Sequence, residues 1–267
     1  LSPVERMTQR FEKLCKMEMP VILEYEKICY LRTITTIPYC YTLDEWESLE
    51  AEHYMYKINN LSPNYYKAVD KGLLAIREDA DEYGKRAIDA IIELSDRYRQ
   101  EAKKQGRNDI VKVLERVPRY GATSFREALQ MFRILHFSLW LEGNKLVTIG
   151  RFDKHIYPYL EADLKNGVLT KEEALELLED FFISFNKDSD ICSSVQTGDN
   201  GQSMMLGGID EDGNDVYNLL SELCLKASCN NKMIDPKINL RVSKNTPQER
   251  YTEATKLTRA GLGFPQY

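Results

Sequence analysis

The chain has 267 residues, 43% of them hydrophobic and 29% charged, and a formal net charge of −6. These values are ordinary for a folded globular protein and exclude an intrinsically disordered chain, which would contain fewer apolar residues. The acidic balance argues against nucleic acid as a partner, because phosphate binding needs a basic surface. No apolar run approaches the roughly 20 residues of a membrane span, and the charged opening residues contain no secretory signal, so we expect a cytoplasmic protein without membrane contact.

In chain order, the first predicted elements are short helices in the Tyr- and Glu-rich part that extends to about residue 62. One of these helices is predicted from Asp44 to Met55. Ser62 is a suitable N-cap for the next helix, and Pro63 would occupy its first position, where a missing N–H group costs nothing.

The middle of the chain is predicted to be helical throughout. Apolar residues recur there with a period near 3.6, opposite to charged residues, which is typical of amphipathic helices. Two capping boxes mark helix starts, Ser124 with Glu127 and Thr170 with Glu173. The predicted helices run from Glu78 to Gln105, from Asp109 to Val117, from Ser124 to about Glu142, and onward from Thr170.

After residue 190 the pattern changes to alternating strands and helices. The predicted elements are a strand from Ser203 to Ile209, a helix from about Val216 to Cys229, a strand from Lys237 to Ser243, and a helix capped by Thr246 with Pro247 and Glu249 and closed by Gly261. Such alternation builds parallel sheets, which need more strands than this and cover on both faces. The closing residues, GLGFPQY, read as a connection to a further strand. We therefore predict a mainly helical α/β chain whose parallel sheet is truncated.

The six cysteines and three histidines show no metal-ligand spacing. No CxxC pair occurs, and without a secretory signal we expect reduced thiols and no bound metal. His136 and His155 have no obvious acidic, Ser or Cys partner in the sequence, so we interpret them as packed side chains rather than catalytic ones.

Three stretches, in order, carry a resemblance to a known family. They are GRFDKHIYPYLEADLKNGVLTKEEALELLEDFFISFN, MMLGGIDEDGNDVYNLLSELCLKA and DPKINLRVSKNTPQERYTEATKLTRAGLGFPQY. Together they resemble the glycyl radical enzymes of the pyruvate formate-lyase family, from about Ser62 to the end of the chain. On this basis we divide the chain into a loosely matched helical segment (1–62), a helical layer (63–190) and the start of a parallel α/β half-barrel (191–267).

The resemblance implies a barrel of two parallel half-sheets wrapped by helices. In this family a glycyl radical oxidises a cysteine, and the thiyl radical then acts on a small substrate, cleaving a C–C, C–O, C–N or C–S bond or starting an addition. A separate activating enzyme, which uses S-adenosylmethionine and an iron–sulfur cluster, installs the radical. The implied partners are this activating enzyme, a small-molecule substrate and further copies of the chain, because uncovered apolar helix faces promote association.

Neither radical residue can be placed in this chain. No cysteine is followed two residues later by Glu, as in the family's thiyl loop, and no Arg-Val-x-Gly-Tyr motif is present. We therefore predict part of a radical lyase or acyltransferase of anaerobic metabolism, with no catalytic residue and no directly bound cofactor in these residues, and no activity of this chain alone. The alternative is a non-catalytic, split or decayed relative that binds a partner chain.

Polar residues around the Gly-Arg segment are the candidates for a substrate pocket. By resemblance, residues just before that segment face the substrate, and a lysine there would suit an anionic group. The alternative for Glu142, Asn144, Lys145 and Thr148 is a solvated loop. For Arg151 and the nearby Asp153 it is a structural ion pair or cap, and for Arg241 it is pairing with an acidic residue outside the barrel. The candidates are Glu142, Asn144, Lys145, Thr148, Arg151, Met205 and Arg241.

Overall fold

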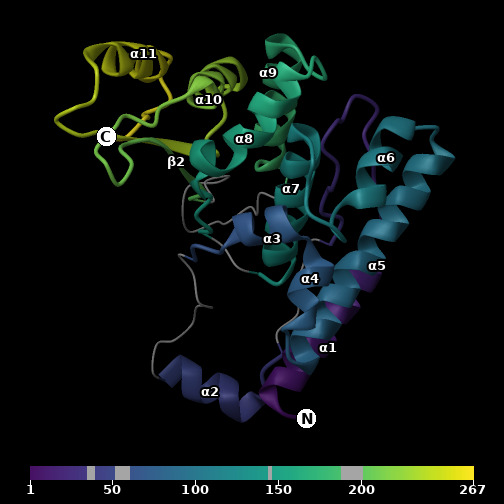
Figure 1. Ribbon diagram of the computed structural model, residues 1–267. Helices are drawn as coiled ribbons and strands as arrows, with labels where there is room; N and C mark the ends of the chain where they lie inside the picture. Colours follow the sequence, from purple (N-terminus) through teal and green to yellow (C-terminus); the bar gives the residue numbers. More distant parts are fainter. Residues whose placement is uncertain (35–39, 52–60, 144–145, 188–200) are drawn as a thin grey trace.

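The computed structural model describes residues 1–34, 40–51, 61–143, 146–187 and 201–267. Helices form most of the molecule, and a small parallel sheet lies toward one end with the C-terminal helices (Figure 1). The helices are α1 (Pro3–Met17), α2 (Leu43–Ala51), α3 (Tyr65–Lys71), α4 (Leu73–Glu78), α5 (Glu82–Lys104), α6 (Asn108–Arg116), α7 (Phe125–Leu141), α8 (Phe152–Lys165), α9 (Lys171–Ser184), α10 (Leu219–Asn231) and α11 (Gln248–Arg259). The strands are β1 (Gly150–Arg151), β2 (Ser203–Gly207) and β3 (Lys237–Arg241).

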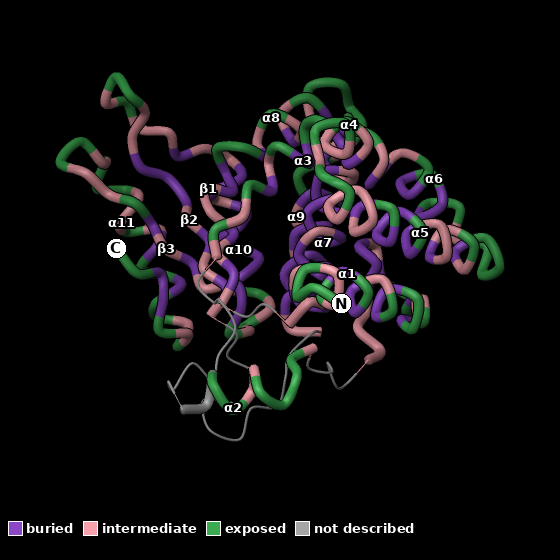
Figure 2. Tube along the Cα trace, turned by 90° about the horizontal axis from the view of Figure 1, so that it is seen from below, coloured by how far each residue is buried: buried purple, intermediate pink, exposed green. Residues whose placement is uncertain are grey.

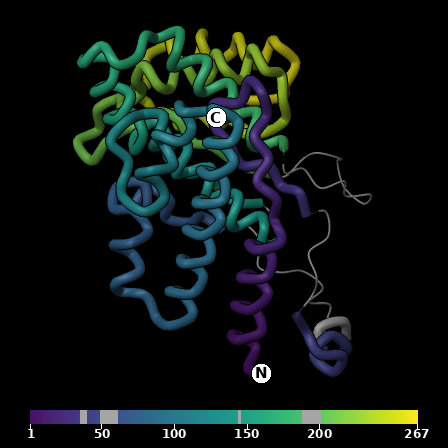
Figure 3. The backbone as a smooth tube through the Cα atoms, turned by 90° about the vertical axis from the view of Figure 1, so that its right-hand side faces the viewer, coloured from purple at the N-terminus to yellow at the C-terminus, as the bar shows by residue number. Residues whose placement is uncertain are grey.

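The N-terminal helix α1 packs along α5, and the two extend away from the C-terminal helices (Figure 3). Arg86 of α5 joins them, because its guanidinium donates to the carboxylates of both Glu5 and Glu12 on α1 at 2.8–3.0 Å. These ion pairs are partly exposed and add specificity more than stability.

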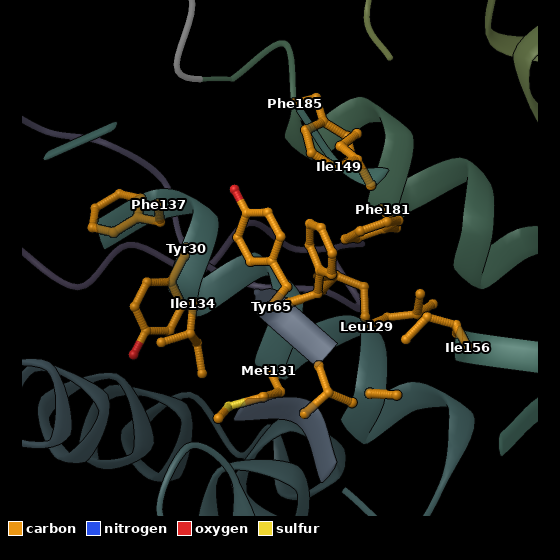
Figure 4. Packing of buried hydrophobic residues seen from close by; sticks show 14 of the residues in the cluster. Tyr30, Tyr65, Leu129, Met131, Ile134, Phe137, Ile149, Ile156, Phe181 and Phe185 are labelled. Atoms are coloured by element: carbon orange, nitrogen blue, oxygen red, sulfur yellow. The ribbon is translucent and has the colours of Figure 1, made fainter. Parts of the chain in front are cut away.

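Helix α7 is the centre of the hydrophobic core, as its apolar sequence predicts. Phe132 stacks on Tyr65 with ring centroids 4.1 Å apart and meets Phe181 of α9 edge-on at 5.7 Å (the surrounding cluster is drawn in Figure 4). Figure 2 shows buried residues gathered where α7 and α9 lie together. The core therefore ties the helical layer to the helix that precedes the sheet.

Two predicted caps are confirmed. The Ser124 side chain accepts from the N–H of Glu127 at the start of α7, although the Glu127 carboxylate turns to Thr123 instead of completing the box. Thr170 and Glu173 form a complete capping box at the start of α9.

Three predicted helix boundaries are wrong. Asn64, not Ser62, caps α3, with its carbonyl oxygen accepting from the Lys67 N–H at 3.2 Å. The helix predicted to start at Glu78 starts at Glu82, because Asp81 caps α5 and Glu78 is the last residue of α4. Thr246 does not cap α11, since its hydroxyl accepts from the Ser243 N–H and Pro247 takes the cap position.

The sheet has strand order β1-β2-β3 and is parallel throughout, as predicted for this part of the chain. Helix α8 packs against β2, and one face of the sheet, carrying Met204, Leu206, Ile238 and Leu240, is buried. The predicted strand Ser203–Ile209 ends early because Gly207 and Gly208 adopt φ values of +64° and +94°, which take the chain out of the sheet.

The closing residues pair with β3. The Gln266 N–H donates to the Ile238 carbonyl at 3.1 Å, and the Leu240 N–H donates to the Gln266 carbonyl at 2.8 Å. Gly261 follows α11 with φ +90°, which confirms it as the terminating glycine.

Within the described ranges, no helix is both long and apolar enough to cross a membrane. The cysteines there, Cys15, Cys29, Cys40, Cys224 and Cys229, are all free, as predicted for reduced thiols. Cys192 and the end of the helix predicted to reach Met55 lie outside the described residues.

Candidate functional site

The face of the sheet opposite to the buried one is only half-covered. In a parallel sheet, residues in register share a face, and here Arg151, Met205 and Asn239 are aligned across all three strands. All three are partly exposed. We call this surface the open face; it is formed by Arg151, Ser203, Met205, Lys237, Asn239 and Arg241.

Two arginines flank the carboxyl end of the central strand. The Arg151 Nη2 atom donates to the Gly207 carbonyl at 3.2 Å. Arg241 is in register with Gly207 and lies against Gly208, where an added Cβ would be 3.0 Å from the Arg241 Cβ. Gly208 therefore allows the Arg241 side chain to approach the turn closely.

The arginines of the open face retain unused hydrogen-bonding capacity. Arg241 is exposed and forms no ion pair with any described residue. The Nε atom of Arg151 is buried and has no hydrogen-bond partner among the described residues. A guanidinium has five donors arranged to match a carboxylate, so this edge of the sheet is chemically suited to an anion.

Asp153 anchors this edge from the interior. Its carboxylate is fully buried and accepts from the Gly207 N–H at 2.6 Å and from the Ser221 Oγ–H at 2.6 Å. Burial raises the pKa of the Asp153 carboxyl, although both hydrogen bonds oppose that rise. Asp153 thus joins the end of β2 to the start of α10.

The remaining sequence candidates lie in different surroundings. Glu142 is the C-cap of α7, and its carboxylate pairs with Arg10 of α1. Asn144 and Lys145 are outside the described residues. Thr148 is half-buried in the segment before β1, where its N–H donates to the Leu61 carbonyl at 2.7 Å. The structure thus brings Arg151, Met205 and Arg241 together on one sheet and gives Glu142 a partner on α1.

Sequence reasoning missed Asn239 as a member of this surface. The signal was present, because apolar Ile238 and Leu240 alternate with their neighbours and so predict that Asn239 shares the face of Arg241.

His136 supports the site without reaching it. Its Nδ1 atom lies 2.8 Å from the Tyr65 hydroxyl, and its Nε2 atom contacts the Gln202 side-chain oxygen. Burial lowers the pKa of His136 to about 3, so the imidazole is neutral at pH 7. The backbone N–H of Gln202 also donates to the Asp235 carboxylate at 3.1 Å, and the network thereby fixes the residues that precede β2 and β3. The prediction that His136 is a packed side chain is confirmed.

His155 is the other histidine of the described helices. It is exposed on α8 and stacks on Tyr66, with ring centroids 4.1 Å apart.

In a comparison against protein-family models, the pyruvate formate lyase-like model matches residues 5–267. The chain belongs to the pyruvate formate lyase-like family. The resemblance to glycyl radical enzymes is thereby confirmed over nearly the whole chain, including the N-terminal part that matched only loosely by motif.

Individual relatives are glycyl radical dehydratases and decarboxylases. The chain is 31% identical to trans-4-hydroxy-L-proline dehydratase of Clostridioides difficile over 76% of its own length and 27% of that protein. It is 32% identical to the glycyl radical subunit of 4-hydroxyphenylacetate decarboxylase of C. difficile strain CD196, over 62% and 19% of the two chains. The glycerol-bound B12-independent glycerol dehydratase of Clostridium butyricum shares the fold, with a TM-score of 0.80 at 21% identity.

This pyruvate formate lyase-like chain spans only part of each relative. It matches about a quarter or less of the two curated proteins and 45% of the glycerol dehydratase chain, although 98% of its own residues superpose on the latter. The activities and substrates of the complete relatives therefore serve only as a basis for proposals about this chain.

One groove of about 420 Å³ lies away from the open face, between α9, α10 and α11. It has an apolar floor that includes Leu175, Leu223 and Leu257, and charged residues at its rim. None of the sequence-predicted site residues lines it. No cluster of three potential metal ligands occurs in the part of the family fold that is described here.

Proposed function

We propose that this chain forms the helical layer and the first strands of the barrel of a glycyl radical enzyme, and that the open face is its substrate-facing wall. The observation that carries the proposal is the asymmetry of the sheet. One face is buried, and the other presents Arg151 and Arg241 at the carboxyl ends of β1 and β3, with Met205 in the middle of β2 between these strands. In open α/β sheets, ligands bind at that end of the strands.

The substrate that this wall fits best is a small anionic metabolite. Two guanidinium groups flank the Gly207 turn, and acidic residues are absent from the open face as defined above. The two curated relatives are named for hydroxyproline and hydroxyphenylacetate, and both compounds contain a carboxylate. The reaction would be cleavage of a C–O, C–C, C–N or C–S bond, as the family's radical chemistry allows.

An Arg151→Gln change in the enzyme that contains this chain tests the proposal. Loss of one partner from a desolvated charge pair costs about 2–5 kcal/mol, so kcat/KM for an anionic substrate should fall by at least about 30-fold, mainly through KM. Lys165→Gln is the control, because Lys165 lies on α8 with its side chain 70% exposed. Equal kcat/KM values for both variants would contradict a role of Arg151 in substrate binding.

The radical residues of such an enzyme would lie outside these 267 residues, because neither family motif occurs within them. The chain alone, incubated with S-adenosylmethionine and a radical activating enzyme, should show no glycyl doublet by electron paramagnetic resonance. A doublet would show that the radical site lies in this chain. Homo-oligomer formation, a cytoplasmic location and the division at residues 62 and 190 belong to the same proposal.

A non-catalytic, partner-binding role is the second candidate. The half-exposed face and the pairing of Gln266 at the edge of β3 favour it, because both are surfaces that another chain could complete. The whole protein would then form no radical with any activating enzyme and still bind its partner chain.

A further inference from the structure

The peptide groups of Gly207 are held by two side chains from one short segment. The Gly207 N–H donates to Asp153 Oδ2 at 2.6 Å, and the Gly207 carbonyl accepts from Arg151 Nη2 at 3.2 Å. Arg151 ends β1, and Asp153 lies in the first turn of α8. One residue acts from the open face and the other from the buried interior.

The anchoring carboxylate is itself fixed by three elements. Besides the Gly207 N–H of β2, it accepts from the Ser221 hydroxyl of α10 at 2.6 Å and from the Lys154 N–H of α8 at 2.8 Å. It has no exposed surface. Because a buried carboxylate with several donors is costly to move, it provides a rigid reference point behind the open face.

We propose that Asp153 is a positioning residue for Arg151: by fixing the Gly207 turn, it holds the carbonyl on which the Arg151 guanidinium rests and so orients that guanidinium on the open face. Gly207 has a positive φ and is followed by a second such glycine, so its conformation has little intrinsic preference and depends on these contacts. The positioning of Arg151 by Asp153 does not depend on the proposed function. Only its consequence, that the oriented guanidinium binds substrate, rests on that proposal.

A matched control is present on the same helix. Asp163 is also a buried aspartate of α8, and its carboxylate accepts from the backbone N–H of Phe125 at 2.8 Å. It holds the first residue of α7 instead of a strand end. Substitution of either aspartate removes a buried acceptor, but only Asp153 is linked to Arg151.

The test is the rate at which phenylglyoxal modifies Arg151, followed by peptide mass spectrometry in the wild-type chain, Asp153→Asn and Asp163→Asn. We expect phenylglyoxal to modify Arg151 about tenfold faster in Asp153→Asn. Loss of a hydrogen bond to a charged group changes an equilibrium constant by about that factor, here the one between the held and the released Arg151 guanidinium. Asp163→Asn should leave the Arg151 rate unchanged. An unchanged rate in Asp153→Asn, or equal increases in both variants, would overturn the proposal.

A second measurement needs no variant and applies even if Asp153→Asn does not fold. The Gly207 amide proton should titrate with the Asp153 carboxyl, with a midpoint above the ordinary value of about 3.9. The neighbouring groups are Arg151, Tyr66 and Cys224, and the last two stay neutral because burial raises the pKa of both. A Gly207 amide that does not titrate would rule out the carboxylate contact.

These readouts separate the two proposals. Both are made without substrate, so they can succeed while Arg151→Gln leaves substrate affinity intact. In that case the positioning role of Asp153 stands, and the proposal that Arg151 binds an anionic substrate is wrong. If instead Arg151→Gln weakens substrate binding and the Asp153 measurements fail, Arg151 contacts the substrate but Asp153 does not position it.

Discussion

Replacement of Gly121 by alanine should destabilise the fold by about 3 kcal/mol, a large effect for a single methyl group. A Cβ at this position would lie 1.8 Å from the carbonyl oxygen of Asp70 and 2.7 Å from its carbonyl carbon. Both are backbone atoms, so no side-chain rotation can relieve the overlap.

The contact at Gly121 is part of a close backbone approach. The loop before α7 runs against the junction of α3 and α4, where the Ala122 N–H donates to the Val69 carbonyl at 2.8 Å. The Leu73 N–H at the start of α4 in turn donates to the Pro118 carbonyl at 2.9 Å. Separation of these segments would leave both donors without partners, which is why the strain cannot be released cheaply.

Gly106→Ala is the control for the Gly121 variant. Gly106 has φ +72° but open space around its Cβ position, so only the backbone penalty of about 1 kcal/mol applies. Urea unfolding at 25 °C measures both values. A Gly121→Ala protein no less stable than Gly106→Ala would show that the two segments are not in contact as described.

Acidification from pH 7 to pH 5 should reduce stability through His136 by about 2 kcal/mol. Its pKa is about 3 in the folded protein against 6.5 as its ordinary value, because the imidazole is buried. The unfolded chain therefore binds the proton first, and this contribution to stability is lost as the pH falls below about 6.5. Carboxylates with lowered pKa, such as Asp109 beside Arg107, add to the loss only at lower pH.

The comparison of His136→Gln with His155→Gln isolates this effect. The first variant should show a flatter dependence of the unfolding free energy on pH between 7 and 5. The second should keep most of the wild-type slope, because His155 is exposed. Identical slopes in the two variants would mean that His136 is not the buried neutral group.

Local chemistry made most of the helices predictable. The caps at Ser124 and Thr170 involve side chains only three residues from their partners, and both caps are found, although only the box at Thr170 is complete. Where two suitable cap residues lie only two positions apart, as with Ser62 and Asn64, sequence alone could not choose between them. Strand β1 has two residues and was not predicted, since it is defined by its pairing with β2 rather than by its own pattern.

The site was less predictable because its contacts join distant parts of the chain. Arg151 and Arg241 could be named, but the Gly207 turn between them is set by Asp153, which is 54 residues away from Gly207 in sequence. Glu142 pairs with Arg10 across 132 residues. No periodicity or spacing rule reports such contacts.

The central claim is that substrate binds against the open face of the sheet. A crystal structure of the protein with a bound anionic substrate tests it most directly. We predict that the substrate's anionic group lies within hydrogen-bonding distance of the Arg151 guanidinium, on the face that carries Met205. Substrate bound in the groove between α9, α10 and α11, with the Arg151 face free of it, would contradict the account.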